Sequence, residues 1–109
     1  MSKDYSSDLQ KLFLEMMLQN PQNYVRVQNI YNAENFDRSL RSAAKFIKEH
    51  VDQHRAMPTR EQVMAVTSTE LKPLPDIGDN HYDWFMTEFE GFTKKQELER
   101  AILKAADMI

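Results

Sequence analysis

Apolar side chains recur at intervals of three and four residues along most of the chain, which is the spacing of one face of an α-helix. The first segment with this spacing covers residues 9–17, and polar residues at positions 6–8 can cap its start. It should end at Asn20, because a residue that precedes proline is disfavoured in the helical conformation. Pro21 can open a second, short helix with an apolar side formed by Tyr24, Val27 and Ile30 or Tyr31.

The longest regular pattern predicts a central helix from about Asp37 to His54, a stretch that contains neither glycine nor proline. Its apolar positions are Phe36, Leu40, Ala43, Ala44, Ile47 and Val51. Met57-Pro58 then interrupts the chain, and residues 59–62 (TREQ) have the Ser/Thr-x-x-Glu/Gln form of a capping box, so a short helix should follow. We expect the core to contain Phe36, Leu40, Ile47, Val51 and Trp84. The apolar stripe of the last predicted helix can begin at either Trp84 or Phe85.

The last third of the chain begins with a predicted loop over residues 67–79, which contain two prolines and Gly78. The helical pattern then resumes, with a shift in phase near Lys95, and predicts a helix over residues 80–109. Such a helix would be about 45 Å long, whereas a globule of this mass is roughly 30 to 35 Å across, so part of it should protrude. The predicted pairing surface on this helix consists of Phe92, Leu98, Ile102, Ala105 and Ile109.

The course of this last helix has two interpretations. Nothing that ends a helix follows Ile109, so the chain is expected to be a piece of a longer protein in which this helix begins a hairpin. Alternatively, Gly91 could bend the helix and fold its last turns back onto the core, so that nothing protrudes.

The composition fits a helical protein. Two glycines and four prolines among 109 residues leave few places for tight hairpins, and 41% hydrophobic with 28% charged residues is a globular balance. We therefore predict an all-α fold, a single compact orthogonal domain of about five helices over residues 1–109, with its globular core at about residues 8–90. A net charge of −3 disfavours binding to phosphate backbones, and the absence of cysteine and of any long apolar run favours a cytoplasmic location without membrane association.

Candidate chemistry is sparse. His50 and His54 lie one helical turn apart, as two zinc ligands would, but no glutamate directly follows His50 and the remaining histidine, His81, lies beyond a loop. We predict a solvated histidine pair and no metal site. Glycine occurs only at positions 78 and 91, which excludes a nucleotide-binding phosphate loop, and no nucleophile motif is present, so neither a catalytic residue nor a cofactor is predicted.

Residues 44–66 could also form a helix-turn-helix in which the capping box opens the recognition helix. That helix would expose Arg60, Glu61, Gln62 and Ala65, whereas base reading usually needs several basic or amide groups flanked by basic residues. An ordinary helical corner is the favoured interpretation. A small DNA-binding regulator that uses these residues is one alternative for the function.

Two stretches, LFLEMMLQNPQNYVRVQNIYNAENF (residues 12–36) and AKFIKEHVDQHRAMPTREQV (residues 44–63), resemble the N-terminal domain of DnaB-type replicative helicases, especially those of tailed phages. The residues that match the family pattern are Phe36, Phe46, Ile47, His50, Val51, Pro58 and Thr59. Residues 81–109 resemble the start of the long helix that follows in this family.

The resemblance implies a non-catalytic helical domain whose last two helices form a hairpin that pairs subunits within a hexameric ring. It also implies docking of primase or a helicase loader on the collar formed by these domains, and an ATPase located in a separate C-terminal domain. None of the family's catalytic motifs lies in this stretch. We therefore expect subunit association and partner docking during DNA replication, with little or no direct DNA binding. The other alternative is a phage adaptor protein of similar helical shape that is unrelated to these helicases.

Overall fold

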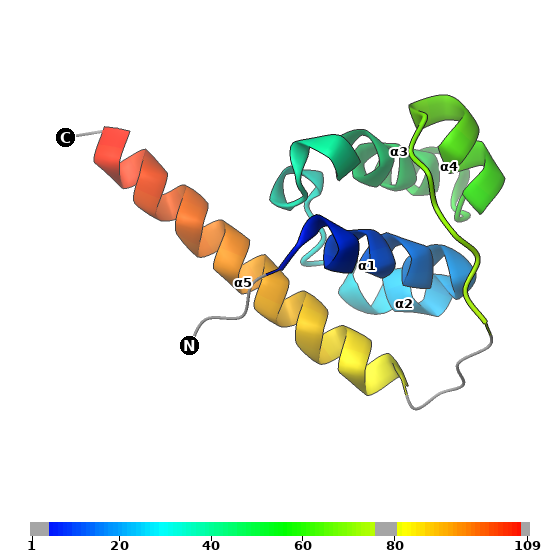
Figure 1. Ribbon diagram of the computed structural model, residues 1–109, viewed down its shortest axis with the longest axis horizontal. Coiled ribbons are helices and arrows are strands. Elements are labelled where there is room, and N and C mark those ends of the chain that lie inside the picture. The colour runs from blue at the N-terminus through cyan, green and yellow to red at the C-terminus, as the bar shows by residue number, and fades with distance from the viewer. Residues whose placement is uncertain (1–4, 76–80, 108–109) are drawn as a thin grey trace.

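Five α-helices and one short 3₁₀ helix form the fold within residues 5–75 and 81–107, the parts of the chain that the computed structural model describes (Figure 1). The elements are α1 (Ser7–Gln19), α2 (Pro21–Val27), η1 (Ala33–Asn35), α3 (Arg38–His54), α4 (Arg60–Thr67) and α5 (His81–Asp107). The predicted all-α fold with a long last helix is confirmed.

The first two helices meet at Asn20, and this residue shapes both of them. Its backbone N–H donates to the carbonyl of Met16 at 3.1 Å and closes α1. Its side-chain oxygen accepts from the backbone N–H of Gln22 at 3.1 Å and caps α2, whose first residue is Pro21. One polar residue before a proline therefore ends one helix and starts the next, as the sequence predicts.

The capping box predicted at residues 59–62 forms at the start of α4. The Thr59 hydroxyl accepts from the backbone N–H of Gln62 at 3.0 Å, and the Gln62 side chain accepts from the backbone N–H of Thr59 at 2.8 Å. Before it, α3 ends at His54, and its C-cap residue Arg55 adopts the left-handed conformation with φ 57°. The turn between α3 and α4 is thus made without a glycine.

An aromatic cluster fills the space between α5 and the other helices. Phe85, Phe89 and Phe92 of α5 are buried against Phe13 of α1, with ring centroids 5.5 to 5.9 Å apart. Phe36, Leu40 and Ile47 are also buried, as predicted.

Two of the predicted core positions differ from the structure. Trp84 is 39% exposed, because Phe85, Phe89 and Phe92 occupy the face of α5 that points inward and Trp84 lies about 100° around the helix from Phe85. Val51 is only partly buried and packs at the edge of the core. Of the two aromatic residues that could have begun the inward face, Phe85 is the one that does.

Two buried polar side chains of α1 connect segments that are far apart in the sequence. Gln10 accepts from the backbone N–H of Asp37 at 2.7 Å and donates to the carbonyl of Tyr5 at 2.9 Å. Glu15 accepts from the backbone N–H of Lys72 at 2.6 Å, which ties the segment after α4 to α1. Buried polar groups that are paired in this way hold a unique arrangement of the elements.

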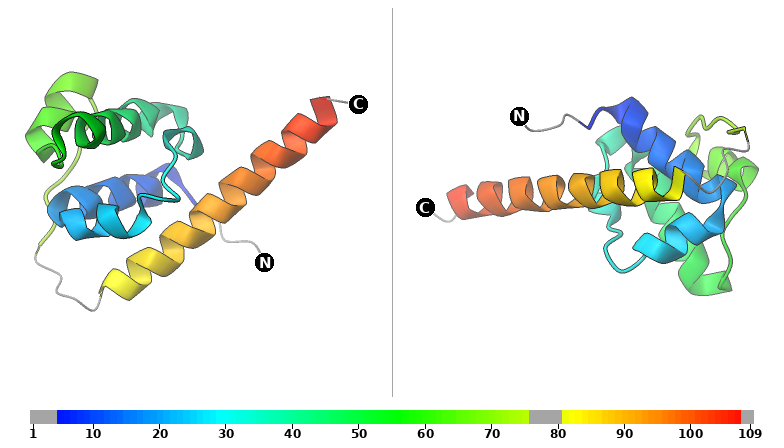
Figure 2. Two further views of the ribbon diagram at one scale, coloured as in Figure 1. Left: turned by 180° about the vertical axis from the view of Figure 1, so that it is seen from behind. Right: turned by 90° about the horizontal axis from the view of Figure 1, so that it is seen from below.

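Helix α5 runs unbroken through Gly91, so the interpretation that this glycine folds the end of the helix back is wrong. Gly91 instead allows a close approach, since a methyl group added there would collide with the hydroxyl of Tyr5. The Tyr5 ring also lies 5.6 Å from the ring of Phe92. The helix has 27 residues, about 40 Å at 1.5 Å per residue, and extends away from the other helices (Figures 1 and 2).

Tyr31 gives the fold a measurable sensitivity to alkali. Burial, followed by the neighbouring Tyr24, raises the pKa of its phenol well above 10.0, and its hydroxyl donates to the Ala44 carbonyl at 2.6 Å. Above pH 10 the unfolded chain loses this proton while the folded chain retains it, so stability should fall by up to about 1.4 kcal/mol per pH unit. Urea unfolding between pH 9 and 11 should show a smaller loss for Tyr31→Phe, and equal losses in both proteins would contradict the assignment.

Candidate functional site

The second half of α5 leaves the globule with apolar side chains in solvent. Phe92 and Thr93 are still buried, but every residue from 101 to 106 is exposed. Leu98 is 61% exposed, Ile102 59% and Leu103 65%. A folded chain rarely leaves large aliphatic side chains so open on one short segment unless another surface covers them.

The five residues predicted to form the pairing surface fall into three groups. Leu98, Ile102 and Ala105 are four and three residues apart and lie together on one side of the protruding segment, here named the α5 stripe. Phe92 does not belong to it, because it is fully buried in the core, about 120° around the helix from Leu98. Ile109 lies outside the described residues.

Leu103 is an exposed apolar residue that the sequence pattern did not assign to the surface. It follows Phe92 by eleven residues, close to three full turns, and so continues the face of the core aromatics beyond the globule. This eleven-residue spacing could have identified Leu103 from the sequence. The predicted surface instead followed the heptad-like spacing of the α5 stripe, which lies on another side of the helix. The protruding segment is thus apolar on two sides.

Tyr5 marks where the α5 stripe begins. Gly91 precedes Leu98 by seven residues and therefore lies on the same side of α5, where the Tyr5 ring covers it. The ammonium group of Lys95 lies 5.8 Å from the centre of that ring, at cation–π distance. Tyr5, two residues before α1, therefore covers this side of α5 as far as Lys95, and the open surface starts at Leu98.

Charged side chains of both signs flank the α5 stripe. Lys94, Glu97, Glu99 and Lys104 are all exposed on the same half of the helix. Mixed charges beside an apolar stripe are typical of a helix that packs lengthwise against another helix, where the flanking charges select the partner and its register.

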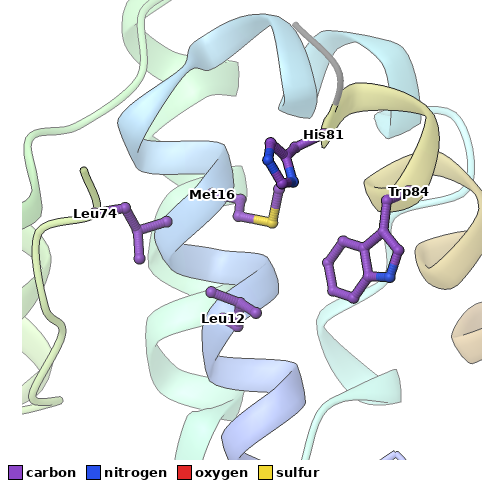
Figure 3. Close-up of a pocket in the computed structure, with 5 residues that line it drawn as sticks. All are labelled: Leu12, Met16, Leu74, His81 and Trp84. Carbon is purple, nitrogen blue, oxygen red and sulfur yellow. The ribbon is translucent and has the colours of Figure 1, made fainter. Parts of the chain in front are cut away.

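A second apolar feature lies at the opposite end of α5. Leu12 and Met16 of α1, Leu74, and His81 and Trp84 of α5 line a hollow of about 390 Å³ (Figure 3). Trp84 forms one wall and also lies 6.5 Å, ring to ring, from Phe13. The hollow offers apolar surface and a single imidazole, which suits the binding of an apolar side chain better than any chemical step.

The histidine pair lies at the end of α3. The His50 and His54 rings are 4.6 Å apart, and His50 Nδ1 is 2.8 Å from the carbonyl oxygen of Ala56. Within residues 5–75 and 81–107, no group of three His, Cys, Asp or Glu side chains could hold a metal ion. His81 belongs to α5 and lines the hollow beside Trp84, so the structure does not bring it to the pair.

The α3–α4 corner is a poor surface for reading DNA. Helix α4 has eight residues, and the guanidinium group of its first residue, Arg60, donates to the Leu71 carbonyl at 3.2 Å and to Glu61 at 3.0 Å. The outward side of α4 carries Glu61, Gln62 and a Val66 that is 64% exposed. A surface with one engaged arginine beside a carboxylate has little to offer a phosphate backbone.

No helix in the described parts of the chain is both long enough and apolar enough to span a membrane. No family model matches the sequence, and no curated protein or solved structure shows significant similarity to it.

Proposed function

We propose that this chain is a non-catalytic association domain, the N-terminal domain of a phage-like replicative DNA helicase of the DnaB type. It works by packing the α5 stripe against a helix of another subunit in a hexameric ring. Primase or a helicase loader docks on the assembled domains. The ring, the replication setting and these partners come from the family resemblance of residues 12–63 and 81–109.

One observation carries the association role: α5 holds Leu98 and Ile102 well clear of its own globule. Burying an aliphatic side chain of this size is worth about 1.5 to 3 kcal/mol, and the fold leaves most of that gain unused at both positions. The segment is already helical, so a partner helix would add apolar contact without the cost of ordering α5.

The size of the α5 stripe also limits the strength of pairing. Two large side chains and an alanine on each copy cover far less area than the roughly 1,200 Å² of a small stable interface. Pairing of two such segments alone should therefore be weak. A ring, in which several such contacts act together, would strengthen it through effective concentration.

The test is sedimentation of the 109-residue chain over a wide concentration range. We expect weak, concentration-dependent self-association, and we expect Ile102→Asp to abolish it, because a carboxylate in the centre of the α5 stripe would be desolvated on pairing. Val66→Asp is the matched control, since Val66 is equally exposed but lies on α4. Circular dichroism should show the same helix content for all three proteins.

The proposal fails if the wild-type chain sediments as a monomer at every concentration, or if Val66→Asp abolishes association as completely as Ile102→Asp. A gel shift with duplex DNA separates it from the alternative of a DNA-binding regulator. Phosphate contacts would weaken steeply as salt rises, so strongly salt-dependent DNA binding would favour the regulator.

A further inference from the structure

The spacing of the α5 stripe continues inward along α5 as far as the globule. Counted from Gly91, the positions Gly91, Lys95, Leu98, Ile102 and Ala105 are separated by four, three, four and three residues. This is the a/d spacing of a coiled-coil seam, and at about 100° per residue the five positions lie within about 80° of one another around the helix. Only the last three are fully exposed, so the seam is longer than the part of it that is open.

Tyr5 covers the two inner positions of this seam. A methyl group at position 91 would collide with the Tyr5 hydroxyl and would lie 3.6 Å from the ring atom Cζ. The Lys95 ammonium group lies 5.8 Å from the centre of the Tyr5 ring, at cation–π distance, and the Phe92 ring lies 5.6 Å away at an angle of 59°. The Tyr5 side chain therefore lies across α5 where the seam passes from the globule into solvent.

Buried hydrogen bonds hold Tyr5 in this place. The side chain of Gln10, which is only 2% exposed, donates to the Tyr5 carbonyl at 2.9 Å and accepts from the backbone N–H of Asp37 at 2.7 Å. Asp37 is the N-cap residue of α3. The backbone of Tyr5 is therefore fixed by contacts that also join α1 to the start of α3, and these contacts keep its ring within reach of α5.

We propose that Tyr5 is a positioning residue, a stop that confines the pairing of two copies of this chain to the part of α5 from Leu98 outward. This inference rests on the association role of the α5 stripe given above. Packed helices lie about 8 to 10 Å apart, axis to axis, so a partner helix has no room over Gly91 while an aromatic ring occupies that side. Lys95 adds to the stop, because a charged residue at a seam position fixes the register of a coiled coil at a cost in stability.

Removal of the Tyr5 side chain should lengthen the overlap between two copies. The open seam over residues 98–105 is about 12 Å long, and the inclusion of Gly91 and Lys95 extends it to about 22 Å. Glycine also lets a partner backbone approach closely. Sedimentation of the 109-residue chain should therefore show self-association tighter by at least about threefold in Tyr5→Ala, a change that needs only about 30 Å² of additional buried apolar surface.

Two further variants test whether the ring itself is the stop. Tyr5→Phe keeps the ring over Gly91 and should associate within about twofold of the wild type. Tyr5→Ala combined with Ile102→Asp should sediment as a monomer, because the longer overlap still needs the centre of the α5 stripe. If circular dichroism shows that Tyr5→Ala has lost helix content, Tyr5→Val replaces it, since valine keeps an apolar contact beside Phe92 but is too short to cross Gly91.

The outcomes separate this inference from the association role. A folded Tyr5→Ala or Tyr5→Val that associates no more tightly than the wild type overturns the stop and leaves the association role intact. Tighter association that persists in the double variant also overturns the stop, because the added contact would then lie outside the α5 stripe. A wild-type chain that stays monomeric at every concentration overturns the association role, and the inference about Tyr5 with it.

Discussion

Replacing Phe92 by alanine should lower the free energy of unfolding by about 3 to 5 kcal/mol, whereas Ile102→Ala should change it by less than about 0.5 kcal/mol. The Phe92 side chain is fully buried and lies 5.2 Å from the ring of Phe36 and 5.6 Å from that of Phe13. Truncation would leave a cavity between α1, α5 and the start of α3. Ile102 contacts no such cluster, and alanine is the better helix former.

Urea unfolding followed by circular dichroism measures both changes, and the same two proteins can be compared for self-association. Ile102→Ala should weaken association with its stability intact, and Phe92→Ala should affect association only through loss of fold. Equal destabilisation by the two substitutions would contradict the division of α5 into a core half and a protruding half.

The elements of the fold were predictable where local chemistry decides them. Asn20 before Pro21, and Thr59 three residues before Gln62, act on backbone groups within a few positions, so their effect can be deduced from the sequence alone. The length of α5 relative to the globule was predictable for the same reason, since helix length follows from residue number.

It was harder to predict which side chains of α5 point toward the core. A difference of one residue rotates a side chain by about 100°, so an apolar pattern that changes phase leaves several residues eligible for the inward face. The structure chooses Phe85 over Trp84 and keeps Phe92 in the core because all three phenylalanines of α5 fit around Phe13. That choice depends on α1, which the pattern of α5 does not contain.

Contacts between distant segments could not be deduced from the sequence. The contact between Tyr5 and Gly91 joins residues 86 positions apart. The sequence alone therefore left open whether Gly91 bends the helix. The same holds for a cavity that Arg41 of α3 and Arg100 of α5 both line, because no spacing in the sequence indicates that these residues lie near each other.

Because Phe13 lies at the centre of the aromatic cluster, its truncation should lower the free energy of unfolding more than truncation of any other residue of α1. Its ring lies 5.5 Å from that of Phe89, 5.6 Å from Phe92 and 5.9 Å from Phe85, the contacts with Phe89 and Phe85 being edge-on. Phe13→Ala should cost about 3 to 5 kcal/mol for the lost burial and cavity, and edge-on aromatic pairs can add about 0.5 to 1.5 kcal/mol each. A loss of that size approaches the whole stability of an ordinary small domain, which is about 5 to 15 kcal/mol.

Trp84→Ala is the informative comparison, because tryptophan is the larger side chain and lies against the same ring of Phe13. With 39% of its surface exposed, however, Trp84 leaves an open hollow rather than a closed cavity when it is truncated. We therefore expect roughly half the loss seen for Phe13→Ala, since the cost follows the area withdrawn from water and the inability of the site to collapse. Urea unfolding followed by far-UV circular dichroism measures the loss of unfolding free energy in Trp84→Ala and in Phe13→Ala. A larger loss for Trp84→Ala would place the centre of the core at the hollow beside His81 rather than at the phenylalanine cluster, and the first half of α5 would then be held by a different set of contacts.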